Sequence, residues 1–286
     1  MSETAGSAAV GTGTGTVHEP AVESADEGNR GGESVVLKEV EIFYGDVRAT
    51  QALSITARRG ELLSIVGASG CGKSSLLRAI GGLLTPHAGT VVINGNPVSG
   101  PRPTEVAYLF QHLALYPWRS AVRNVEIALE FAGVPRKDRH ARAMAALETV
   151  GLADLANRHP AQLCGGMRQR VALARALASD ADILLFDEPF AALDEHSRLQ
   201  LGMELLRVLE EKHKTVVFVT HSLAEAAYLS DRIVVMTPRP GGIADTITVG
   251  LPRPRTPEMM RSAEFHAISD RLSELLFPNP QQDALL

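Results

Sequence analysis

The chain has 286 residues, 45% of them hydrophobic, and a formal net charge of −5 at pH 7. This length and composition suffice for one substantial α/β core with a smaller subdomain. No run approaches the roughly 18 apolar residues of a membrane-spanning helix, so we expect that the chain does not cross a membrane by itself. The only two cysteines, Cys71 and Cys164, exclude a secreted disulfide framework.

Residues 1–34 differ in composition from the rest of the chain. They are rich in Gly, Ala, Ser and Thr, include the run GTGTGT, and contain almost no large apolar side chains. Because such a segment cannot offset the entropy of ordering, we predict a disordered tail. Its six acidic residues and one arginine account for the net charge of −5. The folded part is then near neutral, which gives no electrostatic argument for nucleic acid as a partner.

A phosphate-binding loop is predicted between a buried strand at 62–67 and a helix at 74–84, because GASGCGKS matches GxxxxGK[ST]. In such a loop backbone N–H groups surround phosphate oxygens. Lys73 would reach the β and γ phosphates, Ser74 would bind Mg²⁺, and Ser75 would touch the α phosphate. The predicted nucleotide-binding residues of the loop are Gly67, Ala68, Ser69, Gly70, Cys71, Gly72, Lys73, Ser74 and Ser75. By itself the loop indicates only a P-loop NTPase, a class that includes kinases, GTPases and helicases.

The segment ILLFDEP (183–189) predicts a second buried strand that carries two carboxylates at its end. Its apolar run is typical of a parallel strand covered on both faces. Asp187 is the candidate Mg²⁺ ligand, and Glu188 is the candidate group that polarises the attacking water. The alternative for an isolated Asp-Glu pair after a strand is an ordinary solvated loop.

Between these motifs, LCGGMRQR (163–170) resembles the signature segment of the ATP-binding cassette family of transporter ATPases. The resemblance spans about residues 35–254. It implies an α/β P-loop NTPase (RecA-like) core with an inserted α-helical subdomain and a small antiparallel β subdomain. It also implies a head-to-tail homodimer, in which the signature of one subunit meets the γ phosphate of ATP on the other. Two glycines suit this role because they permit close approach. The helix predicted at about 167–177 suits it because the first N–H groups of a helix are free to bind phosphate.

The resemblance assigns roles to further residues. Tyr44 would stack on adenine, although a half-buried strand aromatic is the alternative. Gln111 would touch Mg²⁺ and the attacking water, Asp194 would cross the dimer interface, and His221 would hold the γ phosphate. The signature would contribute Cys164, Gly165 and Gly166 to nucleotide binding. The predicted catalytic residues are Lys73, Gln111, Glu188 and His221, and the predicted Mg²⁺ ligands are Ser74, Gln111 and Asp187.

Within the family, residues 109–134 and the pairing of TPRPGGI with LPRPR resemble the nitrate, sulfonate and taurine import branch. This implies ATP and Mg²⁺ as cofactors, integral membrane permease subunits as partners, and indirectly a substrate-binding protein. It also implies a peripheral position on the cytoplasmic face of the cell membrane. The transported anion, whether sulfonate, taurine, nitrate or another, is not distinguished by these residues.

The predicted ATPase domain covers 35–254 and includes a helical subdomain at about 112–170. A C-terminal helical extension follows at 255–286, with an amphipathic helix at about 258–277. Trp118 lies just after Gln111, where it would either shape the permease-facing surface or serve a purely structural role.

Two other classes are considered. Some cassette ATPases act in DNA repair or translation, but the family pattern for those is two cassettes in one chain or a long coiled-coil insertion, and neither is visible here. A P-loop metabolite kinase would explain GASGCGKS but not the signature segment, Asp194 or His221.

Cys164 departs from the family pattern, which has serine at this position of the signature. In the expected dimer, Cys164 of one subunit and Cys71 of the other would approach the same nucleotide. Sensitivity to thiol reagents or oxidation is therefore one hypothesis, and two inert thiols are the other.

Cysteine in place of serine predicts that the signature segment binds the γ phosphate of ATP more weakly, which we call a weakened clamp. A thiol donates only weakly to phosphate oxygens, whereas a hydrogen bond to a charged acceptor contributes about 1.5 to 3 kcal/mol. Cys164→Ser should therefore raise ATPase activity, measured as phosphate release under saturating ATP. An unchanged rate in the serine variant would contradict the weakened clamp.

Overall fold

A computed structural model describes Met1 and residues 32–277, so most of the tail predicted for 1–34 lies outside the described residues. The predicted end of the tail is two residues too late, because Glu33 and Ser34 begin the first strand. The strands are β1 (Glu33–Tyr44), β2 (Val47–Arg58), β3 (Leu62–Gly67), β4 (Ala88–Ile93), β5 (Asn96–Pro97), β6 (Val106–Leu109), β7 (Ile183–Asp187), β8 (Thr215–Val219), β9 (Arg232–Met236) and β10 (Ile243–Thr248). The helices are α1 (Lys73–Ile80), α2 (Ala121–Phe131), α3 (Arg136–Thr149), α4 (Gly165–Ala178), α5 (Glu195–Lys212), α6 (Leu223–Leu229) and α7 (Ala263–Leu276). Short 3-10 helices are η1 (Ala153–Leu155), η2 (Pro160–Gln162) and η3 (Pro257–Arg261).

Two sheets form the core. The larger has the strand order β10-β9-β3-β8-β7-β6, in which β10 is antiparallel to β9 and the other neighbours are parallel. Every residue of β7 and β8 is buried, as expected for apolar runs that are covered on both faces. The smaller sheet is antiparallel, with the order β2-β1-β4-β5. An α/β P-loop core with an antiparallel β subdomain is confirmed.

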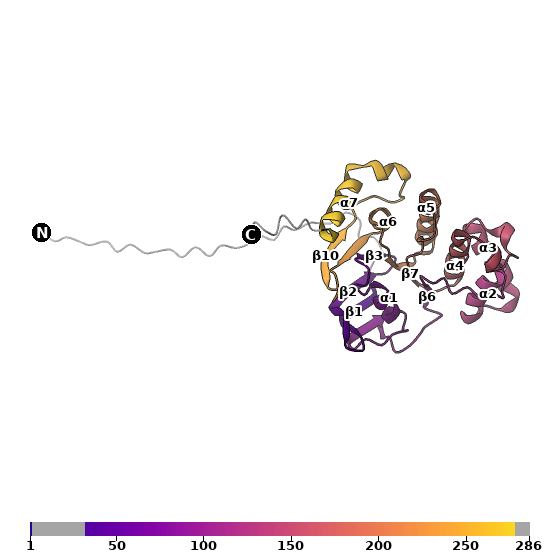
Figure 1. The fold of residues 1–286 in the computed structure, drawn as a ribbon, viewed down its shortest axis with the longest axis horizontal. Coiled ribbons are helices and arrows are strands. Elements are labelled where there is room, and N and C mark those ends of the chain that lie inside the picture. The colour runs from indigo at the N-terminus through magenta and orange to yellow at the C-terminus, as the bar shows by residue number, and fades with distance from the viewer. Residues whose placement is uncertain (2–31, 278–286) are drawn as a thin grey trace.

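Helices α2, α3 and α4 gather at one end of the molecule, on the side of β6 and away from α7 (Figure 1). Their apolar residues belong to the same buried cluster as β7, β8 and α5. The signature helix starts at Gly165 and ends at Ala178, two residues earlier and one later than its predicted bounds. The inserted helical unit is therefore joined to the core through one continuous apolar interior.

The helix predicted at 74–84 is shorter in the structure, because α1 ends at Ile80. The following Gly82 has a φ of 69°, and a Cβ there would lie 2.2 Å from the carbonyl oxygen of Gly100. A glycine in the left-handed region just after a helix is a common stop signal. The apolar residues beyond Ile80 therefore continue as irregular structure.

The C-terminal helix predicted at 258–277 is two helices in the structure. The 3-10 helix η3 is followed by α7, and Ser262 separates them by accepting a hydrogen bond from the Phe265 N–H at 3.1 Å. Serine is a favoured N-cap, which explains the new start. Across residues 32–277, none of the helices is both long and apolar enough to cross a membrane.

The RPGG turn (Arg239–Gly242) packs against the phosphate-binding loop and β2. Gly241 donates a backbone hydrogen bond to Ala49 at 3.0 Å and accepts one from Gln51 at 2.8 Å. A Cβ on Gly241 would lie 1.9 Å from the carbonyl oxygen of Cys71. Only glycine allows this close approach of two backbones.

Gly241→Ala should therefore lower the free energy of unfolding by about 1 to 3 kcal/mol, because the added methyl group forces the turn and the loop apart. Chemical denaturation of purified protein measures this loss. Gly250→Ala is the matched control, since a Cβ there meets no other described atom within 4 Å. Equal stability of the two variants would contradict the packing argument.

Candidate functional site

Four neighbouring parallel strands deliver the predicted catalytic residues and Mg²⁺ ligands to one edge of the sheet. Strand β3 leads into the phosphate-binding loop, and β7 ends in Asp187. Gln111 lies two residues beyond β6, and His221 lies two residues beyond β8. Because the strands run parallel, their carboxyl ends meet at the same edge, where ligands bind in open α/β sheets.

The phosphate-binding loop closes around the amine of Lys73. Lys73 Nζ donates to the carbonyl oxygens of Gly67 at 2.8 Å and Ala68 at 2.9 Å. Gly72 has a φ of 103°, and a Cβ there would lie 2.5 Å from Thr50 Cγ2. The loop thus requires glycine at this position, and it presents a cation at the start of α1, where an anion is favoured.

Ser74 and Asp187 lie in direct contact. Ser74 Oγ donates to Asp187 Oδ1 at 3.0 Å, and Asp187 is 3% exposed. Burial raises the pKa of the Asp187 carboxyl above its ordinary value, and the hydrogen bond from Ser74 opposes this shift. A hydroxyl beside a carboxylate is a hard oxygen pair, so these two residues fit Mg²⁺ as ligands.

The Glu188 carboxylate is the meeting point of two further predicted residues. Gln111 Nε2 donates to Glu188 Oε2 at 3.3 Å, and His221 Nδ1 lies 3.5 Å from the same oxygen. A carboxylate, an amide and an imidazole therefore face one another at the sheet edge. This set can accept a proton from water and orient it.

A cleft of about 400 Å³ opens beside the phosphate-binding loop, Gln111 and Glu188, and neither His221 nor Asp187 lines it. The residues that line it are Tyr44, Ala49, Ser69, Gly70, Gly72, Lys73, Ser74, Ser75, Gln111, Glu188 and Arg239. Tyr44 is 45% exposed, and its hydroxyl lies 3.0 Å from Ser75 Oγ. The aromatic ring thus borders the open side of the cleft, next to the phosphate-binding loop.

The signature residues and Asp194 are not among the residues that line this cleft. Cys164 is exposed and occupies the N-cap position of α4, and its side chain makes no capping hydrogen bond within the described chain. Asp194 caps α5, accepting from the Ser197 N–H at 2.9 Å, and this bond lowers the pKa of its carboxyl. Within one chain, the signature residues and Asp194 therefore do not contribute to the cleft.

The two cysteines differ in accessibility. Cys71 is 0% exposed, with its sulfur 3.8 Å from Lys73 Nζ, whereas Cys164 is exposed. The burial of Cys71 favours the inert alternative for this thiol in the present conformation.

Sequence reasoning missed Gln169, which lies in the signature helix and is 2% exposed. Its Nε2 donates to the Glu188 carbonyl oxygen at 3.0 Å, and its Oε1 accepts from the Ala192 N–H at 2.7 Å. The motif LCGGMRQR contains this residue, but nothing in the sequence says that its amide turns inward. Arg239 of the RPGG turn was also missed as a cleft residue.

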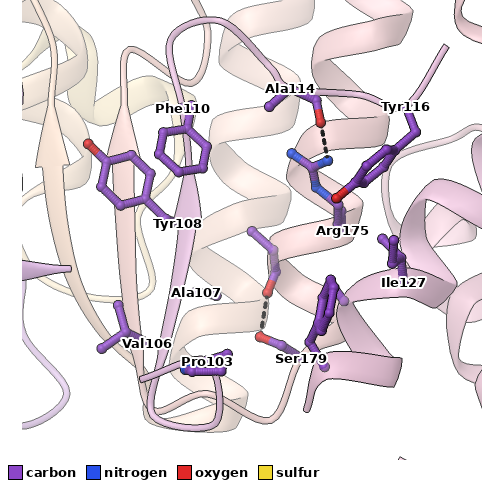
Figure 2. Close-up of a pocket in the computed structure, with 13 residues that line it drawn as sticks. Pro103, Val106, Ala107, Tyr108, Phe110, Ala114, Tyr116, Ile127, Arg175 and Ser179 are labelled. Atoms are coloured by element: carbon purple, nitrogen blue, oxygen red, sulfur yellow. Dashed lines mark hydrogen bonds between the residues drawn. The ribbon is translucent and has the colours of Figure 1, made fainter. Parts of the chain in front are cut away.

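A second, mostly apolar pocket of about 290 Å³ lies between β6 and the helical unit (Figure 2). Its wall includes Phe110, next to Gln111, and Phe131, which is 62% exposed. Figure 2 shows the Arg175 guanidinium pointing toward the loop after Gln111, where it donates to the carbonyl oxygens of Leu113 at 2.6 Å and Ala114 at 2.7 Å. Helix α4 is thereby tied to the loop that carries Gln111.

The fold and the cleft beside the phosphate-binding loop define a P-loop ATPase. The family model described as ABC transporter matches residues 50–191. The nitrate import ATP-binding protein of Synechocystis is 39% identical over 81% of this chain and 89% of its own length. The taurine import ATP-binding protein of Roseobacter denitrificans is 42% identical over 71% of this chain and 76% of its own. The chain is also similar to a solved ATP-binding cassette, a dimer in a post-hydrolysis state with ADP and phosphate bound. The TM-score is 0.70, and the sequences are 33% identical, with 75% of this chain and 98% of that chain covered.

The chain therefore belongs to the ABC transporter family, as an ATP-binding protein whose ATPase activity is coupled to transport.

The burial of Cys71 predicts unequal thiol labelling. In the native protein, a maleimide should modify Cys164 rapidly and Cys71 at least about tenfold more slowly, because only local opening exposes a buried group. Mass spectrometry of timed samples measures both rates, and labelling in denaturant should reach two thiols per chain. Cys164→Ala is the control that removes the rapid phase. Equal rates at the two cysteines would show that the loop opens freely.

Proposed function

We propose that two copies of this chain bind ATP head to tail and hydrolyse it to drive import of a small anion through separate permease subunits. The most direct support is the separation within one chain between the cleft and the signature residues. A second copy in head-to-tail orientation would place its Cys164, Gly165 and Gly166 over the first copy's cleft. The dimeric state of the similar solved cassette supports this arrangement.

In the proposed complex, ATP lies in the cleft with its adenine against Tyr44 and its phosphates in the loop from Gly67 to Ser75. Lys73 leaves its two carbonyl partners and pairs with the β and γ phosphates, since a charged acceptor binds an ammonium group more strongly than a carbonyl does. The signature glycines and the first N–H groups of α4 bind the γ phosphate from the other side. Asp194 meets the partner chain at the interface.

Hydrolysis requires an oriented water molecule and compensation of charge on the γ phosphate. Glu188 accepts the proton of the attacking water, and Gln111 holds that water in place. His221, adjacent to the Glu188 carboxylate, donates to the γ phosphate. Ser74, Asp187 and Gln111 would hold Mg²⁺, which neutralises phosphate charge when it is bound.

The contact with the membrane partner is assigned to the second pocket and the residues around it. Its apolar wall, the 72% exposed Trp118 and the exposed Phe131 form a surface suited to a helix of a permease. The pocket borders the loop after Gln111, so a bound permease would lie next to a residue that touches the nucleotide. The chain would then sit peripherally on the cytoplasmic face of the membrane.

Relatives named for nitrate and taurine import support a small anion as the transported substrate. A substrate-binding protein would deliver that anion to the permease. The proposed ATPase domain covers about 35–254, including the helical subdomain at about 112–170, and 255–286 form a C-terminal extension.

Glu188→Gln tests this proposal, because glutamine keeps the shape of the side chain but cannot accept the proton. We expect the ATPase rate to fall at least about 100-fold, in line with the contribution of a general base. ATP binding should persist, and the variant should accumulate as an ATP-bound dimer in sedimentation velocity. The same variant with ADP in place of ATP is the control. A variant that stays monomeric at saturating ATP, even with its membrane subunits present, would contradict the shared site.

A further inference from the structure

Glu225 of α6 is a charged side chain close to the cleft that the proposed mechanism does not use. It belongs to the segment that follows His221, and its side chain is 9% exposed. Burial raises the pKa of this carboxyl above its ordinary value, and the contacts with Thr220 and Arg198 oppose the rise. A carboxylate in this position is held by partners on two sides.

The first partner connects Glu225 to the segment around Asp194. Arg198 Nε lies 3.1 Å from Glu225 Oε1, and Arg198 Nη2 donates to the Leu193 carbonyl oxygen at 3.2 Å. The Arg198 N–H also donates to the Asp194 carbonyl oxygen at 2.9 Å. Arg198 therefore binds the backbone on which Asp194 is carried, and its guanidinium forms an ion pair with Glu225 in which Nε makes no hydrogen bond to the described residues.

The second partner connects Glu225 to the residues on both sides of His221. Thr220 Oγ1 donates to Glu225 Oε2 at 2.5 Å and accepts from the Ser222 N–H at 3.0 Å. Ser222 Oγ in turn accepts from the Glu225 N–H at 3.3 Å. The residues before and after His221 are thus fixed by contacts that include Glu225, and His221 Nδ1 lies 3.5 Å from Glu188 Oε2.

We propose that Glu225 is a positioning residue that links the backbone at Asp194, through Arg198 and Thr220, to the placement of His221 beside Glu188. This inference depends on the proposed function, in which Asp194 meets a partner chain and His221 acts on the γ phosphate. Docking of the partner at Asp194 then favours the catalytic placement of His221 in the same chain. ATP bound to an isolated chain would lack that contribution.

A purely structural role for Glu225 makes a different prediction. Removing one member of a buried ion pair destabilises a protein, and the resulting loss of activity would follow loss of folded protein. A positioning role lowers kcat while the folded chain still binds ATP. The two are separated by measuring kcat, KM and thermal stability on the same samples.

The test is Glu225→Gln, which keeps the size of the side chain but removes the charge that pairs with Arg198. We expect kcat for ATP to fall about 5- to 20-fold, with KM and the affinity for a fluorescent ATP analogue within twofold of the unmodified chain. Glu210→Gln is the matched control, because Glu210 lies in α5 and pairs with Arg253 at 2.7 Å, away from the cleft. This control should keep kcat within twofold.

A double-mutant cycle tests the link itself. Glu225→Gln combined with Arg198→Gln should lower kcat no further than the stronger single variant, because both interrupt one connection. Thr220→Ser, which keeps the hydroxyl, should retain kcat, whereas Thr220→Val should resemble Glu225→Gln. Multiplied effects of Glu225 and Arg198 would overturn the proposal. So would an unchanged kcat in Glu225→Gln, or a kcat that falls only in proportion to thermal stability.

Failure of this inference is distinguishable from failure of the proposed function. If Glu188→Gln abolishes hydrolysis and traps the dimer while Glu225→Gln turns over normally, the shared site stands and the link is wrong. If Glu188→Gln still hydrolyses ATP, the proposed function fails, and the role assigned to His221 fails with it.

Discussion

The site depends on the backbone of Glu188, which leaves β7 with a φ of 52°. A residue other than glycine in this left-handed region costs roughly 1 to 2 kcal/mol. Three hydrogen bonds hold it there. Its N–H donates to the Val219 carbonyl at 2.9 Å, and its own carbonyl accepts from Gln169 at 3.0 Å and from the Ala191 N–H at 3.3 Å. Successive side chains of an extended strand point to opposite faces. Because the backbone turns at Glu188, the Asp187 side chain contacts Ser74 while the Glu188 side chain contacts Gln111 at the same edge of the sheet.

The hydrogen bond from Gln169 also connects the helical unit to the backbone of the catalytic candidate Glu188. Because α4 starts at the signature and carries Gln169, the N-terminus that would face a partner's phosphate is fixed relative to the Glu188 backbone. Arg175, farther along the same helix, binds the loop after Gln111. A movement of α4 would have to break these bonds or carry both segments with it. This gives a mechanical route between the surface that we propose for the permease and the nucleotide-binding cleft.

The sequence predicted β3 and β7, because each is a largely apolar run that leads directly into a motif, whereas the four-residue β6 carries no such signal and was not predicted. Helix ends were predicted less well, since α1 stops at a glycine pair within an apolar pattern and α7 restarts at Ser262. The link between Arg198 and Glu225 joins residues on two helices, so no local pattern signals it. The burial of Cys71 was equally invisible, because a loop motif specifies backbone shape and not which short side chain turns inward.

In the proposed dimer, a site divided between two chains makes closure depend on the nucleotide. The first N–H groups of α4 have no capping side chain in the described chain, since the thiol of Cys164 does not reach them. Water must satisfy these donors in an isolated subunit, and a γ phosphate would replace that water in the dimer. A serine at this position would both cap its own helix, worth about 1 kcal/mol, and donate to phosphate. The cap would stabilise the isolated subunit, and the bond to phosphate would stabilise the dimer. Closure depends only on how much more serine contributes in the dimer than in the isolated subunit, because a contact made equally in both states shifts no equilibrium.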